Sequence, residues 1–110
     1  MQNSSVLVLS VLAGATLTDK RFVSPTGGLP SAGGNTLGVA NSDASSGDMC
    51  PVNHLGTAVV EVSGAISKGA LVETGNDGRA AAKDTGVSVA RALQEATASG
   101  QFIEVTLIPN

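Results

Sequence analysis

The sequence predicts a small all-β domain, a compact barrel or sandwich with at most one short helix. Two observations carry this prediction. Short segments rich in Val, Ile and Leu recur along the 110 residues, and clusters of Gly, Asn, Asp, Ser and Pro separate them. Helix signals are weak, because only residues 91–98, RALQEATA, would support a single helical turn, capped by Gly100.

The expected strands follow these segments in chain order. The turn at 76–78, Asn-Asp-Gly, predicts a hairpin, because Asn and Gly tolerate the positive φ that such a turn needs. In the last strand Ile103 and Val105 alternate with Glu104 and Thr106, which predicts one buried face. The expected strands cover residues 6–12, 20–24, 36–40, 49–53, 57–63, 70–74, 79–82, 86–92 and 101–108.

The N-terminal segment 5–17, SVLVLSVLAGATL, is as apolar as the core of a signal peptide. However, no Lys or Arg precedes it, and it is too short to span a bilayer. We therefore expect a strand, buried either in the domain's own core or against a partner. The chain divides into this N-terminal strand or arm, residues 1–14, and a single β domain, residues 15–110.

The two halves of the chain resemble each other in pattern. LTDKRFVSPTGG, which starts at Leu17, parallels ISKGALVETGNDG, which starts at Ile66. Further along, Val39-Ala40 parallels Val89-Ala90. A duplicated β unit predicts pseudo-twofold character, and two repeats are too few for a solenoid.

Composition argues against nucleic acid as a partner. The net charge is −3, and the six Lys and Arg residues are scattered, whereas phosphate binding needs clustered cations. Two Phe and no Trp or Tyr leave few surfaces on which bases could stack. The single cysteine, Cys50, cannot form an intrachain disulfide, which agrees with synthesis in a reducing cytoplasm.

Groups that could support catalysis are few. His54 is the only histidine, and no Gly-x-Ser-x-Gly elbow is present. Cys50 and His54 are too few ligands for zinc, and both are expected to be ordinary strand residues. The Asn-Asp-Gly turn begins like a calcium loop, but alanines occupy the later ligand positions. We expect no enzyme, and no catalytic, cofactor or metal site.

Two long segments carry a resemblance to a known family. Residues 60–82, VEVSGAISKGALVETGNDGRAAA, and 86–109, GVSVARALQEATASGQFIEVTLIP, resemble the capsid cement or decoration proteins of tailed bacteriophages. The first contributes a hairpin pattern and the second a closing Ala-, Gly- and Val-containing pattern. Ala70 stands where that family usually has an acidic residue. The matching motifs are turns and strands, so they specify a fold more than a site.

The resemblance implies a structural role. Such proteins bind the outer surface of an expanded icosahedral head, typically as homotrimers at local threefold positions, in contact with the major capsid protein. This chain would then be made in the host cytoplasm and end on the outer capsid surface, with no cofactor and no membrane or nucleic-acid partner.

The apolar N-terminal strand is the expected capsid or trimer contact, because a strand with an unpaired edge can add to a partner's sheet. Phe22 and Phe102, the only aromatics, are expected in the core. The alternative function is a small surface- or carbohydrate-binding β module displayed on a particle, which would need an exposed aromatic or carboxylate cluster. The expected contact residues are Val6, Leu7, Val8, Leu9, Val11 and Leu12.

Overall fold

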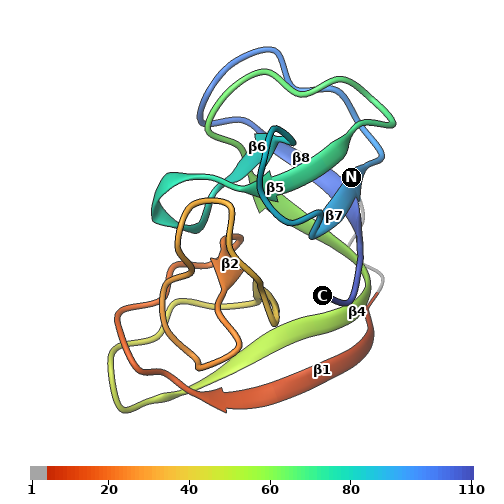
Figure 1. Ribbon diagram of the computed structural model, residues 1–110. Coiled ribbons are helices and arrows are strands. Elements are labelled where there is room, and N and C mark those ends of the chain that lie inside the picture. Colours follow the sequence, from red (N-terminus) through yellow and green to blue (C-terminus); the bar gives the residue numbers. More distant parts are fainter. Residues whose placement is uncertain (1–4) are drawn as a thin grey trace.

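The computed structural model describes residues 5–110, and within them the chain forms one strongly curled sheet, nearly closed into a barrel (Figure 1). The strand order is β2-β3-β4-β8-β7-β5-β6, and β1 pairs with β4 outside this path. The all-β prediction is confirmed. The elements are β1 (Ser5–Leu12), β2 (Phe22–Val23), β3 (Gly38–Ala40), β4 (Met49–Glu61), β5 (Leu71–Thr74), the 3-10 turn η1 (Asn76–Gly78), β6 (Ala80–Ala82), β7 (Ala90–Ala92) and β8 (Phe102–Leu107).

The long strand β4 connects the two halves of the molecule. Its N-terminal part pairs with β1 and β3, and its C-terminal part pairs with β8. The sequence predicted two strands here, 49–53 and 57–63, and that prediction is wrong. Gly56 has a φ of 100°, a conformation open to glycine, and the strand continues through it without a break.

The internal duplication is confirmed by equivalent main-chain hydrogen bonds. Leu17 and Ala44 exchange N–H···O bonds of 2.8 and 3.0 Å, and Ile66 and Ala96 exchange bonds of 3.0 and 2.9 Å. Each half therefore joins two loop segments through the same pair of main-chain hydrogen bonds. The first half comprises residues 5–53 and the second half residues 57–107.

The register of the duplication differs from the prediction by two residues. Val23 pairs with Gly38 in the first half, and Val72 pairs with Ala90 in the second. Strand β3 is thus equivalent to β7, so Val39-Ala40 corresponds to residues 91–92 and not to Val89-Ala90. The predicted helical turn at 91–98 is also wrong, because its first residues belong to β7 and Ala96 bridges to Ile66. Pairing across the sheet overrides the helix propensity of this stretch.

The predicted hairpin at 76–78 is confirmed. Strands β5 and β6 pair through Thr74 and Ala80, and η1 makes the connection. Asp77 and Gly78 have φ values of 60° and 77°, so the turn does use the left-handed region that its residues favour.

Two hydrophobic clusters fill the interior. Phe22 and Val39 belong to the first half in sequence but pack into the cluster of the second half, and Phe22 is 1% exposed. The core role predicted for Phe22 is confirmed. Phe102 is 43% exposed, so its predicted core role is wrong: it points to the opposite face of β8 from Ile103. The large cluster comprises Phe22, Val39, Ala58, Val60, Val62, Ile66, Val72, Ala80, Val89, Ala90, Ala92, Ala96, Ile103 and Val105. The small cluster comprises Ala13, Leu17, Val23, Ala40, Ala44, Cys50 and Val52.

Loops from the two halves also meet directly. Gly33 donates its N–H to the Thr74 carbonyl at 2.7 Å and accepts the N–H of Val87 at 2.9 Å. A Cβ added at Gly86 would lie 2.5 Å from the Gly33 Cα, so this crossing requires glycine. The Glu73 carboxylate accepts the N–H of Gly86 at 3.1 Å and fixes the loop from the other side. These contacts hold the halves in one orientation.

Candidate interaction surface

Four of the eight large apolar side chains that are exposed in residues 5–110 lie on β1. Val6 is 78% exposed and Leu12 is 61% exposed, with Leu7 and Val8 also exposed between them. Leu12 lies opposite Met49 of β4 in the strand register, and Met49 is 60% exposed. Val6, Leu7, Val8, Leu12 and Met49 are called the β1 ribbon below. A group of exposed apolar side chains of this kind is typical of a protein interaction site.

The remaining predicted contact residues lie on the opposite side of the strand. Leu9 and Val11 are half-buried, and Val11 packs against the small cluster. They face Val52 and Cys50, which are fully buried. The structure therefore places four of the six predicted contacts on the surface, while Leu9 and Val11 are half-buried.

Met49 was missed by sequence reasoning although a signal was present. In the segment MCPV, Cys50 and Val52 are buried and alternate with Met49 and Pro51. This period-two pattern, read against β1, would have placed Met49 on the outer face.

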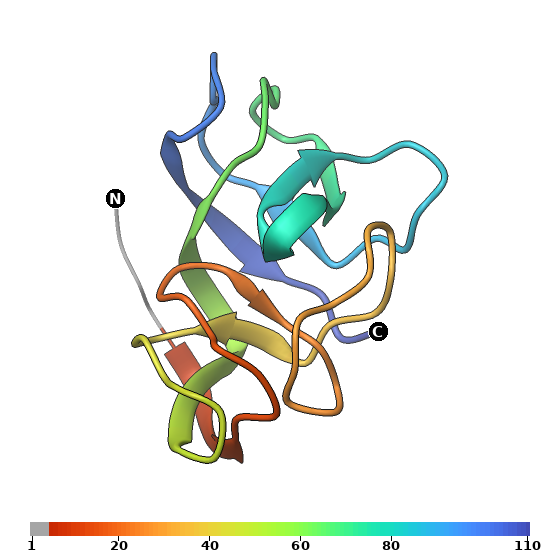
Figure 2. The same cartoon turned by 90° about the vertical axis from the view of Figure 1, so that its left-hand side faces the viewer.

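The outer edge of β1 is a second feature of this surface. Among the strands of residues 5–110, β1 pairs only with β4. Figure 2 shows it beside β4 at the base of the molecule. Ala13 donates its N–H to Asp48 at 2.8 Å, toward β4, so alternation along the strand directs the N–H of Leu12 to the other edge. An edge of this kind can accept another strand.

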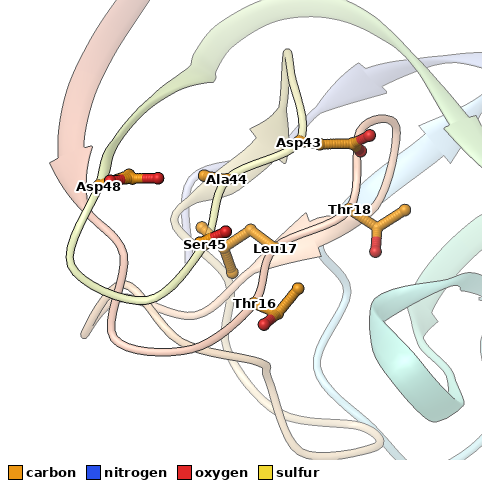
Figure 3. A pocket seen from close by; sticks show the side chains of 7 residues that line it. All are labelled: Thr16, Leu17, Thr18, Asp43, Ala44, Ser45 and Asp48. Carbon is orange, nitrogen blue, oxygen red and sulfur yellow. The ribbon is translucent and has the colours of Figure 1, made fainter.

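A recess of about 360 Å³ lies between segments 16–18 and 43–48 of the first half, which Leu17 and Ala44 join (Figure 3). Figure 3 shows that Asp43 and Asp48 stand on opposite sides of it, separated by Ala44 and Ser45. Asp43 is already engaged, because its Oδ1 accepts the Asp19 N–H at 2.7 Å. The carboxylates do not converge, and neither Phe lines the recess, so it offers no platform for a sugar. Its lining residues are Thr16, Leu17, Thr18, Asp43, Ala44, Ser45 and Asp48.

The residues weighed for metal or nucleophilic chemistry are both in β4. Cys50 is fully buried, and burial raises the pKa of its thiol, which disfavours the reactive thiolate. His54 is half-buried, and its Nδ1 lies 2.7 Å from the Leu37 carbonyl oxygen. In the described part of the chain no three His, Cys, Asp or Glu side chains gather as metal ligands would. Residues 5–110 also contain no helix with the length and apolar character needed to cross a membrane.

The fold and the surface together define a small β protein whose prominent feature is an exposed apolar strand. The phage cement protein family matches residues 1–107, and the chain belongs to that family. It is therefore a structural, virion-associated phage protein of nearly all-β fold.

A solved structure has the same fold. The crystal structure of the head fiber gp8.5 N base in bacteriophage phi29 superposes with a TM-score of 0.72 at 22% identity. The match covers 93% of this chain and 93% of that one. The search of curated proteins found no match.

Proposed function

We propose that this protein is a capsid cement protein that binds the outer surface of the expanded icosahedral head and holds neighbouring major capsid subunits together. It acts without catalysis, as homotrimers at local threefold positions. Membership of the phage cement protein family supports the class, and the exposed β1 ribbon is the single structural observation that carries the binding role.

The physical basis of the stabilisation is linkage. A protein that binds the expanded lattice and not its precursor favours the expanded state by mass action, without any chemical step. Modest contacts suffice, because a trimer that engages several capsid subunits at once gains effective concentration at each further contact. The exposed apolar side chains of the β1 ribbon can supply such contacts, because burying Val, Leu and Met side chains is favourable at about 25 cal/mol per Å².

The test is the number of copies on purified particles, counted by quantitative mass spectrometry relative to the major capsid protein. A cement protein at local threefold positions should reach about one copy per capsid subunit, because a trimer places three copies where three subunits surround the axis. A handful of copies would point to a vertex or tail attachment. Absence from particles would contradict the proposal and favour a surface-binding module.

Substitutions locate the contact. Val8→Glu and Met49→Glu place a charge on the outer face of the β1 ribbon and should reduce binding to expanded heads. Leu29→Glu is the matched control, since Leu29 is 51% exposed on a loop outside the ribbon. Equal head occupancy by all three folded variants would show that the ribbon is not the contact.

A further inference from the structure

The two halves of the chain contact each other in one specific way. Glu61 of β4 donates its N–H to the Lys20 carbonyl oxygen at 2.8 Å, and its carboxylate lies 3.2 Å from Arg21 Nε. Beside this pair, Phe22 and Val39 of the first half cover the second half's core. The first half thus covers the edge of β4 at Glu61 and one side of the second half's hydrophobic cluster.

The duplication defines the equivalent position in the first half. Val11 pairs with Cys50 as Val60 pairs with Ile103, so Leu12, the next residue of β1, corresponds to Glu61. Val60 is fully buried, whereas Val11 is half-buried and Leu12 is 61% exposed. The first half therefore has the equivalent strand edge. Gly27 lies against Val11 and the Leu12 carbonyl there, but no backbone carbonyl of residues 5–110 accepts the Leu12 N–H as that of Lys20 accepts the Glu61 N–H.

The second half has the complementary covering surface. Gly69 donates to Ala92 at 2.8 Å as Lys20 donates to Ala40 at 2.9 Å, so the segment after Gly69 corresponds to the one after Lys20. Leu71 then stands where Phe22 stands in the first half, and it pairs with Arg91 as Phe22 pairs with Val39.

This covering surface is open. Leu71 is half-buried and Arg91 is exposed. A recess of about 470 Å³ lies here, lined by Ala70, Leu71, Ala82, Lys83, Asp84 and Arg91. Figure 1 shows β5, β6 and β7 in the upper half of the view and β1 along its lower edge, at opposite ends of the molecule.

The chemistry of the two surfaces matches. The ion pair of Glu61 with Arg21 is replaced at the equivalent positions by Leu12 and Ala70, an apolar pair that needs no charge partner. The Gly69 carbonyl, equivalent to that of Lys20, accepts Arg91 Nη1 at 2.8 Å. Arg91 therefore donates to the Gly69 carbonyl, as the Glu61 N–H donates to the Lys20 carbonyl in the contact between the halves. Because Arg91 is exposed, its side chain can move away into solvent.

We propose that copies of this chain associate head to tail, with Leu12 and the free edge of β1 in one copy seated on the Ala70–Leu71 surface of the next, reproducing the contact between the halves. Such a heterologous contact closes into a ring when the rotation between successive copies divides a full turn. The inference deepens the self-association in the proposed function, because it names both surfaces and their pairing.

The test uses purified full-length protein without capsids, and reads its oligomeric state by sedimentation equilibrium and native mass spectrometry. Leu12→Glu should weaken association by about a hundredfold or more, because it buries an unpaired carboxylate. Ala70→Arg should weaken it in the same way. The double variant Leu12→Glu with Ala70→Arg recreates the Glu61–Arg21 pair between copies and should restore association.

Leu29→Glu is again the matched control, and circular dichroism of each variant checks that it is folded. A monomeric wild type at its highest soluble concentration would overturn the inference and leave Leu12 with the rest of the β1 ribbon as capsid contact. Unchanged association in folded Leu12→Glu, or a double variant no better than the singles, would overturn it too. Association that is retained by protein unable to bind heads would contradict the proposed function and support this inference.

Discussion

Lys20 and Gly69 occupy equivalent positions in the two halves, and both have positive φ, 63° and 85°. Lys20 donates its N–H to the Ala40 carbonyl, and Gly69 donates its N–H to the Ala92 carbonyl. Both halves therefore have a left-handed backbone conformation at this position, but only the second half has glycine, the residue best suited to it. A non-glycine residue pays about 1–2 kcal/mol in this conformation.

Backbone strain at this position predicts opposite effects in the two halves. Gly69→Ala should lower the free energy of unfolding by about 1 kcal/mol, since its Cβ would touch no atom within 4 Å and only the backbone cost remains. Lys20→Gly should raise it by up to about 1 kcal/mol, less the entropy that glycine adds to the unfolded chain. Urea unfolding measures both. Gly64→Ala is the control, with open space and no positive φ, and a loss there as large as at Gly69 would exclude this explanation.

The two phenylalanines should differ strongly in their contribution to stability. Phe22→Ala removes a buried ring at the junction of the halves and should cost about 3–5 kcal/mol. Phe102→Ala truncates a ring that is 43% exposed and should cost less than about 1.5 kcal/mol. Thermal unfolding of both, with Phe22→Leu as a milder substitution, provides the comparison. Similar losses for the two alanine variants would mean that Phe22 is not the anchor between the halves.

The Arg21–Glu61 pair should couple the halves energetically. Both side chains are largely buried, with exposures of 26% and 16%, and a second guanidinium, that of Arg79, lies 3.8 Å from Glu61 Oε2. Glu61→Gln should cost about 1–3 kcal/mol, because two partly buried guanidinium groups lose the negative charge that balances them.

A double-mutant cycle with Arg21→Gln isolates the pair and should give a coupling of about 1 kcal/mol. Asp19→Asn is the exposed comparison: Asp19 pairs with Lys20 at 3.0 Å, and the loss should be near zero. Zero coupling between positions 21 and 61 would refute the role of this pair.

Cys50 predicts a loss of stability at alkaline pH. Burial is the largest cause that raises the pKa of its thiol above the ordinary 9.0. Above about pH 9 the unfolded chain releases this proton while the folded chain keeps it. The unfolded state therefore binds fewer protons, and stability falls with rising pH by at most about 1.4 kcal/mol per pH unit.

Unfolding midpoints of wild type and Cys50→Ala, compared from about pH 8 to about pH 10.5, test this linkage. The alanine variant should be less stable at neutral pH because of the lost volume, but its stability should decline less steeply. Parallel curves for the two proteins would contradict the prediction.

Local sequence determined most of the strands, the η1 hairpin and the existence of a duplication. These features depend on alternation and on turn residues such as Asn76 and Gly78, whose effects act within a few positions of the chain. Four exposed apolar residues on β1 were indicated by sequence, because the apolar segment 6–12, broken only by Ser10, is conspicuous. The fifth, Met49 of β4, was not.

Tertiary structure alone decided how the duplicated units are joined. The continuity of β4 through Gly56, the exposure of Phe102 and the strand state of residues 90–92 all depend on which strand pairs with which, and pairing between distant segments leaves no local pattern. The sequence by itself shows that positions 12 and 70 are apolar, Leu12 and Ala70. Only the fold revealed that they stand where Glu61 and Arg21 meet, because equivalence between two contacts exists only once both halves are packed.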